Sequence, residues 1–368
     1  MIVQSNASTT VTIDGTSYLY FGGTNYLGIA HRPELLDKAA QAFKNYGFSA
    51  GASRLTSGEN SLILSLEKQL AEFGRSSNAL VMPAGFIANS AVVDGVEDFT
   101  DVWVVHTQAH GSITAAISKS RKPVIKDDFN FTDDKRSFRQ RHNLSTNTRL
   151  CVFAEPIDVM SGSLLHVPSL LAATEQSDLV VLDEAHSFGV LGKTGYGAQE
   201  HFAIDRPETL IRTGTFSKAL GTYGGFILAN KRIIDAVKLG SSAYKASTPL
   251  TPVVCAAAQE ALRLVVEDAP NTVDKLKDNL SRLNNLLTER QVGNFIGQCI
   301  PIYNLANSPA VARLRDALPD RGICVPTVTS YFADYCEIGL RWTIQAGHSE
   351  GELQTLVSVI SDNCSPQR

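Results

Sequence analysis

The chain has 368 residues, 43% of them hydrophobic and 19% charged, with a formal net charge of −4. This composition excludes a disordered chain and offers no basic surface for nucleic acid. It contains no apolar run of the ~20 residues that a membrane span needs, and its start lacks the basic flank and apolar stretch of a secretory signal. Six scattered cysteines without a Cys-x-x-Cys pair predict reduced thiols, no metal site and a cytoplasmic location.

Strand and helix patterns alternate through the first two thirds of the chain. Amphipathic helices are predicted first, over 33–44 and 61–73. Seven short apolar runs then predict strands, at 79–82, 102–106, 123–126, 150–154, 179–182, 210–213 and 225–228. Helical patterns lie between them, at 88–93, 111–119 and 168–176. This alternation predicts an α/β fold with a mainly parallel sheet that is covered on both faces.

The last third of the chain shows a different pattern, in which predicted helices dominate at first. Helices are predicted over 232–239, 252–267 and 273–289, followed by a smaller α/β portion. We therefore expect three parts: an N-terminal segment at 1–45, a large domain at 46–265 and a small C-terminal α/β domain at 266–368.

The first chemical signal is Asp183, which ends an apolar strand and opens the run Asp-Glu-Ala-His186. Ligands of open α/β sheets lie beyond the carboxyl ends of the strands, so Asp183 is placed to meet one. The same four letters occur in a helicase motif, but that function needs a phosphate loop upstream. The single Gly-Lys-Thr, at Gly192–Thr194, lies downstream. We therefore reject the helicase hypothesis.

The second signal is Lys218, which follows another apolar strand together with hydroxyls at Thr215 and Ser217. A lysine amine suits a covalent link to an aldehyde, whereas hydroxyls and glycine amides suit a phosphate. An isolated lysine would be interpreted as a solvated surface residue. Here an acid at a strand end, Asp183, favours a functional role.

Two further strand ends carry candidate ligands. Gly85 and Phe86 follow a strand and open a helix, whose first amides can bind phosphate. His110 follows another strand and could stack on a flat ring, although a lone histidine is more often structural. Together with the lysine and the acid, these features meet the requirements of pyridoxal phosphate (PLP).

The ordered motifs resemble the α-oxoamine synthases, the PLP fold type I family that includes 8-amino-7-oxononanoate synthase and serine palmitoyltransferase. The resemblance is colinear from about residue 18 to about residue 358. The motifs that carry it are Asn25-Tyr-Leu-Gly28, Gly51-Ala-Ser-Arg54-Leu-Thr-Ser-Gly58, Ala84-Gly85-Phe86, His110-Gly-Ser112, Asp183-Glu-Ala-His186, Thr215-Phe-Ser-Lys218, Ser247-Thr248-Pro-Leu-Thr-Pro252 and Leu340-Arg341 with His348.

The resemblance implies a role for each matching residue at the cofactor. Lys218 would bind the PLP aldehyde and later move protons. Asp183 would pair with the pyridine nitrogen, His186 would hydrogen-bond the ring hydroxyl, and His110 would stack on the ring. Three residues would hold the phosphate: Gly85, Phe86 and Thr215.

The resemblance also implies a homodimer with a shared active site, in which Thr248 reaches the phosphate of the neighbouring subunit. Arg341 would clamp the carboxylate of an amino acid substrate, with help from Asn25. The implied reaction condenses that amino acid with an acyl thioester such as acyl-CoA, and gives an α-aminoketone with loss of CO2. Two alternatives stay open: a fold type I aminotransferase or decarboxylase, and a non-catalytic PLP-binding homologue.

Several substrate-recognition positions depart from the family pattern. The arginine that biotin-pathway members carry ahead of Asn25 is missing. A histidine usual after the Ser-Arg-Leu motif falls on Ile63. The family's Pro-Pro-Thr-Val-Pro and Ser-Met-Asp-Gly-Asp stretches fall on 330–334 and 159–163. The cofactor residues are intact, so the departures concern the acyl donor.

Overall fold

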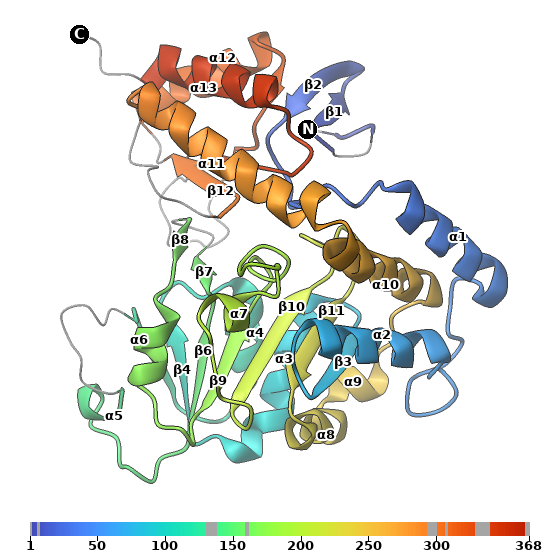
Figure 1. Cartoon of the computed structure of the whole chain (residues 1–368). Helices are drawn as coiled ribbons and strands as arrows, with labels where there is room; N and C mark the ends of the chain where they lie inside the picture. The colour runs from blue at the N-terminus through green and yellow to red at the C-terminus, as the bar shows by residue number, and fades with distance from the viewer. Residues whose placement is uncertain are drawn as a thin grey trace. The chain divides into compact units, whose positions relative to one another are not determined.

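The computed structural model describes residues 2–5, 8–129, 138–158, 162–292, 300–305, 308–327 and 339–364. Contacts divide the chain into two compact units (Figure 1). The large unit comprises Pro33–Ile157 and Leu165–Arg263. The small unit comprises Met1–Arg32, Asp158–Leu164 and Leu264–Arg368.

The large unit is built on a seven-stranded sheet with the order β3-β11-β10-β9-β6-β4-β5. In that order the strands are Asn78–Met82, Gly225–Ala229, Leu210–Thr215, Leu179–Asp183, Leu150–Ala154, Val102–His106 and Val124–Asp127. Only β11 runs antiparallel to its two neighbours, and the other pairs are parallel. The mainly parallel sheet predicted from the sequence is confirmed, as are its seven strands.

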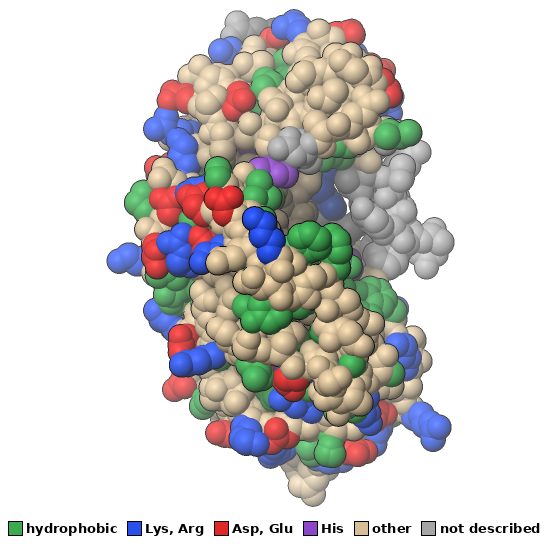
Figure 2. Space-filling view, turned by 90° about the vertical axis from the view of Figure 1, so that its right-hand side faces the viewer, with side chains coloured by type: hydrophobic (Ala, Val, Ile, Leu, Met, Phe, Trp, Pro, Cys, Tyr) green, Lys and Arg blue, Asp and Glu red, His purple; other side chains and the backbone are tan. Residues whose placement is uncertain are grey.

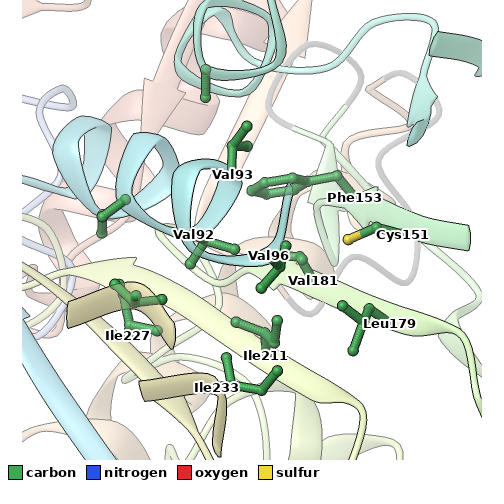
Figure 3. Close-up of a cluster of buried hydrophobic side chains, with 14 of the residues drawn as sticks. Val92, Val93, Val96, Cys151, Phe153, Leu179, Val181, Ile211, Ile227 and Ile233 are labelled. Atoms are coloured by element: carbon green, nitrogen blue, oxygen red, sulfur yellow. The ribbon is translucent and has the colours of Figure 1, made fainter. Parts of the chain in front are cut away.

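Helices cover both faces of this sheet. On one face, α3 (Gly85–Val96), α4 (Gly111–Ile117) and α8 (Lys231–Gly240) enclose an apolar core. Figure 3 shows Val92 and Val96 of α3 over strand residues such as Phe153. On the other face lie α5 (Phe138–Arg141), α6 (Val167–Ala172) and α7 (Ala198–His201). Because both faces are buried, central strands such as β6 and β9 are buried at every residue instead of alternating, whereas the edge strand β5 is partly exposed.

The remaining helices of the large unit lie at its sequence ends. They are α1 (Pro33–Tyr46), α2 (Ser61–Phe73), α9 (Ser242–Ala246) and α10 (Pro252–Glu267), with a 3-10 turn at Glu97–Phe99. The predicted bounds of α2 are confirmed, because the Asn60 side chain accepts hydrogen bonds from the first amides and caps the helix.

The small unit combines both ends of the chain. A hairpin of β1 (Thr10–Ile13) and β2 (Thr16–Tyr20) pairs with β13 (Ile323–Cys324). Its turn, Asp14-Gly15, has positive φ at both residues, as a tight hairpin requires. A second pair joins β12 (Ile302–Leu305) to β14 (Leu340–Thr343). The other elements are α11 (Val273–Glu289), α12 (Pro309–Asp320), α13 (Glu350–Cys364), β7 (Ile157–Asp158), β8 (Ser163–Leu164) and a 3-10 turn at Ala269–Asn271.

None of the helices that the structure describes is long and apolar enough to cross a membrane. Figure 2 shows basic and acidic side chains interspersed over the face that it draws. Four cysteines are free thiols, and the other two, Cys299 and Cys336, lie outside the described residues. Within the described ranges, no three His, Cys, Asp or Glu side chains are grouped to hold a metal ion.

His348 is a buried histidine that makes the small unit sensitive to acid. Its ring stacks on Phe21 at 4.4 Å, its Nδ1 accepts the Gln345 amide, and its Nε2 lies 3.1 Å from the Tyr20 carbonyl. Burial lowers the pKa of His348. The neutral ring therefore stabilises the fold above the unfolded pKa of about 6.5, and this contribution is lost as the pH falls below it.

We accordingly expect the free energy of unfolding to decrease between pH 7.5 and pH 5, and to decrease less steeply in His348→Asn, which does not titrate. Urea unfolding of both proteins across this range measures the two slopes. Parallel slopes would show that His348 is not the group responsible.

Candidate active site

A cavity of 210 Å³ lies at the carboxyl ends of the strands in the large unit. Its lining includes seven residues singled out from the sequence: Gly85, Phe86, His110, Asp183, His186, Thr215 and Lys218. The cavity is completed by Ala84, Ser112, Glu155, Ala185, Ser217, Tyr223 and Gly224.

The register of the sheet brings these residues together. Asp183 pairs with Thr213 across β9 and β10, so Asp183 and Thr215 reach the same edge. Gly225 pairs with Thr215 on one side and with Met82 on the other. A Cβ atom at Gly225 would lie 2.3 Å from the backbone of Ala84, so only glycine permits this approach.

Lys218 and His186 meet in the cavity. Lys218 Nζ lies 2.7 Å from His186 Nε2, and both side chains are half-buried. Lys218 follows β10 and His186 follows β9, which are neighbouring parallel strands. The amine is therefore held beside an imidazole that can exchange a proton with it.

Asp183 is fixed by two hydrogen bonds. It is 8% exposed, its Oδ1 accepts the Ala185 amide at 2.9 Å, and its Oδ2 accepts Asn89 Nδ2 at 2.7 Å. A buried carboxylate that accepts two donors keeps a defined orientation. Its position beside the cavity suits a partnership with a protonated ring nitrogen.

His110 caps helix α4 and borders the same cavity. Its amide donates to Glu155 Oε2 at 2.8 Å, and its Nδ1 lies 2.8 Å from Ser112 Oγ. Burial lowers the pKa of His110, and so does the nearby Lys218 charge, whereas Asp183 opposes them. The neutral imidazole is therefore favoured, as stacking on a flat ring requires.

The opposite end of the cavity offers donors for an anion. Helix α3 begins at Gly85 without a side-chain cap, so its first amides have no capping partner from Ala84. Thr215 Oγ1 lies 2.8 Å from Ser217 Oγ and donates to the Gly224 carbonyl at 2.7 Å. The uncapped amides suit a phosphate group, whereas Thr215 would have to give up the Gly224 carbonyl to donate its single hydroxyl proton to one.

A buried ion pair anchors the turn that carries these groups. Glu184 and Arg212 are essentially unexposed, and Arg212 Nε donates to Glu184 Oε1 at 2.7 Å. Arg212 also donates to the carbonyls of Gly74 and Tyr196. Because Glu184 directly follows Asp183, this ion pair holds the carboxyl end of strand β9 in place.

The donor set fits PLP. The cofactor needs a primary amine, an acid at its ring nitrogen and donors for its phosphate, and one cavity presents all three. Lys218 would hold the aldehyde carbon and Asp183 the ring nitrogen. The phosphate would lie at the end of the cavity that is lined by Gly85 and Thr215.

Three predicted residues lie apart from this lining. Thr248 is exposed in the segment between α9 and α10 and is not among the lining residues. Arg341 belongs to the small unit, where its Nε donates to Asn304 Oδ1 at 2.9 Å. Asn25 is in the same unit, and its buried Nδ2 has no hydrogen-bond partner among the described residues.

The departures from the family pattern are only partly described. Residues 330–334 and 159–161 lie outside the described residues. Ile63, which replaces the family's histidine, is fully buried in α2. An apolar side chain there fills the core instead of reaching a ligand.

Sequence reasoning assigned no role to Asn89, Ser112 or Glu155, although all three contact predicted site residues. Asn89 is a polar residue in a mainly apolar helix, and Glu155 directly follows a buried strand. A polar residue at either of these positions could have been identified from the sequence as a candidate site residue. Ser112 stood in a quoted motif.

The chain matches the family described as aminotransferase class I and II over residues 17–360. It is 31% identical to 8-amino-7-oxononanoate synthase from Geotalea daltonii, covering 98% of this chain and 92% of that protein. Serine palmitoyltransferase from S. paucimobilis, solved with PLP bound as a myriocin aldimine, has a similar fold, with a TM-score of 0.88. The sequences are 22% identical, and the match covers 98% of this chain and 91% of that one.

The 8-amino-7-oxononanoate synthase from Francisella tularensis also shares the fold, with a TM-score of 0.78, 24% identity, and coverage of 94% of this chain and 97% of that one. The family match spans nearly the whole chain, and the cavity contains the groups that PLP requires. The chain therefore belongs to the α-oxoamine synthase branch of the PLP-dependent class I and II aminotransferase family.

Proposed function

We propose that this protein is a PLP-dependent acyltransferase that condenses an amino acid with an acyl thioester, giving an α-aminoketone with loss of CO2. The reaction would resemble that of 8-amino-7-oxononanoate synthase. The observation that carries the proposal is one cavity in which Lys218 Nζ lies 2.7 Å from His186 Nε2, beside the buried carboxylate of Asp183.

Each side chain has a task that its geometry supports. When bound, PLP supplies an aldehyde and a ring that withdraws electrons from the carbon next to the substrate nitrogen. Lys218 would hold the aldehyde carbon through its amine until the substrate amine displaces it, and the freed amine would then take a proton from that substrate carbon. Asp183 holds a proton on the ring nitrogen, and His186 keeps the lysine amine and the ring hydroxyl in place.

The rest of the cavity orients and holds the cofactor. His110 stacks its neutral ring on one face of the cofactor. The phosphate is held at the uncapped start of α3 and by the hydroxyl of Thr215, where amides and hydroxyls are concentrated. Fixing the cofactor at both ends would hold the reacting groups in one orientation, which lowers the entropic part of the barrier.

The substrate carboxylate is proposed to bind Arg341 and Asn25. A guanidinium fork matches a carboxylate bidentately, and the buried Asn25 Nδ2 has a hydrogen bond still to donate. Both residues belong to the small unit, and Arg341 acts electrostatically on the neighbouring Tyr26.

We predict that Arg341→Ala raises the KM for the amino acid about 10- to 100-fold, because a charged hydrogen bond is worth about 1.5–3 kcal/mol. The visible absorbance of the bound cofactor should not change. Arg282→Ala is the control, since Arg282 forms an exposed ion pair with Glu350 in the same unit. An unchanged KM in Arg341→Ala would move the carboxylate site elsewhere.

The proposal also covers the assembly of the protein, its location and its domain boundaries. The protein acts as a homodimer, in which Thr248, exposed here, reaches the phosphate bound by the partner. It acts in the cytoplasm. The functional domains stay those expected from the sequence, at 1–45, 46–265 and 266–368, whereas the compact units of the structure change at Arg32–Pro33 and at Arg263–Leu264.

The decisive experiment mixes the purified protein with PLP, a panel of amino acids and a panel of acyl-CoA thioesters. The proposal predicts release of free thiol and CO2 that depends on both substrates and is absent in Lys218→Ala. Amino-group transfer to a keto acid without thiol release would instead indicate an aminotransferase. Release of CO2 without an acyl donor would indicate a decarboxylase, and no turnover at all a non-catalytic homologue.

A further inference from the structure

Asn89 is a buried amide at the centre of a polar network behind the cavity. It lies on α3 and is 1% exposed. Its Nδ2 donates to Asp183 Oδ2 at 2.7 Å and to Ser112 Oγ at 2.9 Å, and its Oδ1 accepts the Thr213 hydroxyl at 2.7 Å. Both protons of the amide nitrogen are therefore used, and each goes to a neighbour of the cavity.

The network fixes which way the amide points. Because the Asp183 carboxylate only accepts hydrogen bonds, its partner on Asn89 must be the amide nitrogen, which leaves the carbonyl oxygen to accept the Thr213 hydroxyl. Thr213 is itself 1% exposed, and its backbone position on β10 pairs with Asp183 on β9. The orientation of Asn89 is thus set by the sheet itself.

Ser112 connects Asn89 to His110 through hydrogen bonds. Ser112 Oγ accepts a proton from Asn89, so its own hydroxyl proton is available to His110 Nδ1 at 2.8 Å. The Ser112 amide also donates to Nδ1, at 3.2 Å. A nitrogen that accepts two donors carries no proton, which leaves the ring proton of His110 on Nε2.

We infer that Asn89 is a positioning residue that sets two active-site groups at once: it holds the Asp183 carboxylate in place and selects the Nε2-protonated, neutral form of His110. The inference deepens the proposed function, since both groups contact PLP in that proposal. An aspartate at 89 would put a second carboxylate beside Asp183, and a leucine would remove one hydrogen bond from each of three buried groups: Asp183, Ser112 and Thr213.

Burial of His110 points the same way, because it lowers the pKa of the ring and favours its neutral form. The other charged groups around the ring are Asp183, Glu155 and Lys218, of which Glu155 binds the His110 amide and not its imidazole. The tautomer is therefore set by Ser112, whose amide and hydroxyl face Nδ1 and whose hydroxyl is held by Asn89, rather than by a charged partner.

The test compares three full-length variants with the wild-type protein: Asn89→Leu, Thr213→Val and, as a control, Asn279→Leu. Asn279 is a fully buried asparagine of the small unit that donates to three backbone carbonyls, so its loss destabilises the protein without touching the cavity. Two quantities are measured: the 15N shifts of the His110 ring before PLP is added, assigned with His110→Gln, and the Kd for PLP by absorbance titration.

We expect the wild-type ring to be unprotonated at Nδ1 and protonated at Nε2. Asn89→Leu should show a mixture of the two tautomers and bind PLP about 10-fold or more weakly. Thr213→Val removes the donor to Asn89 Oδ1 but leaves the amide nitrogen on Asp183 and Ser112. It should therefore change both quantities in the same direction by less, and it tests the inference even where Asn89→Leu does not fold. Asn279→Leu should change neither.

Unchanged ring shifts in both site variants, or a wild-type ring protonated at Nδ1, would overturn the inference. An equal loss of PLP affinity in Asn279→Leu would overturn it as well, because general destabilisation would then account for the effect. The ring shifts are recorded without cofactor or substrate, so a failure of the acyltransferase proposal is seen in the turnover assay and not in this measurement.

Discussion

Replacing Lys218 with alanine is expected to remove the covalent link to PLP and to lower turnover by at least about 10²- to 10⁴-fold, the contribution of a positioned general acid or base. The structure places Nζ of this lysine 2.7 Å from His186 in the cavity lining, and no other lysine lines the cavity as described. Borohydride reduction followed by intact-mass measurement should add one cofactor to the wild-type chain and none to the variant.

Lys231→Ala is the matched control for this experiment. Lys231 is a highly exposed lysine of the same unit, paired with Asp235 at the surface of α8. It should keep both the added mass and the turnover. If Lys218→Ala still gained one cofactor on reduction, another amine would carry the link and the assignment of the cavity would be wrong.

The fold was largely predictable because a sheet buried on both faces leaves a plain signal in the sequence. Each strand is a short run of apolar residues between turn residues, and each ends where a polar residue begins. Helix α3 was harder: we predicted 88–93, whereas it spans Gly85–Val96. This helix is buried on most sides, so it lacks the amphipathic period that marks the ends of a helix.

The strand order could not be predicted from these patterns. β11 inserts antiparallel between β3 and β10, although it follows β10 in the chain. What permits the insertion is the missing side chain of Gly225, which brings β11 against Ala84. That is a contact between residues far apart in the sequence, and local propensity does not report it.

The residues of the candidate site were likewise only partly predictable from the sequence. Residues such as Asp183 and Lys218 were found because reactive groups at strand ends carry chemistry of their own. Asn89 was given no role, because its partner Asp183 is 94 residues away and only the packing of α3 on the sheet joins them. The residues that hold a site in place are set by tertiary structure more than those that react.

Replacing Asp183 with asparagine should leave PLP bound but lower turnover by about 10²- to 10³-fold, as expected for the loss of one preorganised electrostatic group. The amide has nearly the same shape as the carboxylate and keeps one of the two hydrogen bonds, because Ala185 and Asn89 donate to different oxygens of Asp183. It carries no charge, however, and cannot hold a proton on the ring nitrogen.

Turnover per bound cofactor, measured by thiol release, gives the loss directly. Asp178→Asn is the matched control, because Asp178 is a buried acid that precedes the same strand at its other end and pairs with Arg139. That variant should lose stability, since breaking a buried pair leaves Arg139 unpaired, but should keep its turnover per bound cofactor. Near-normal turnover in Asp183→Asn would mean that charge at the ring nitrogen does not drive the reaction, and with it the chemical reason for a buried acid at this strand end would be lost.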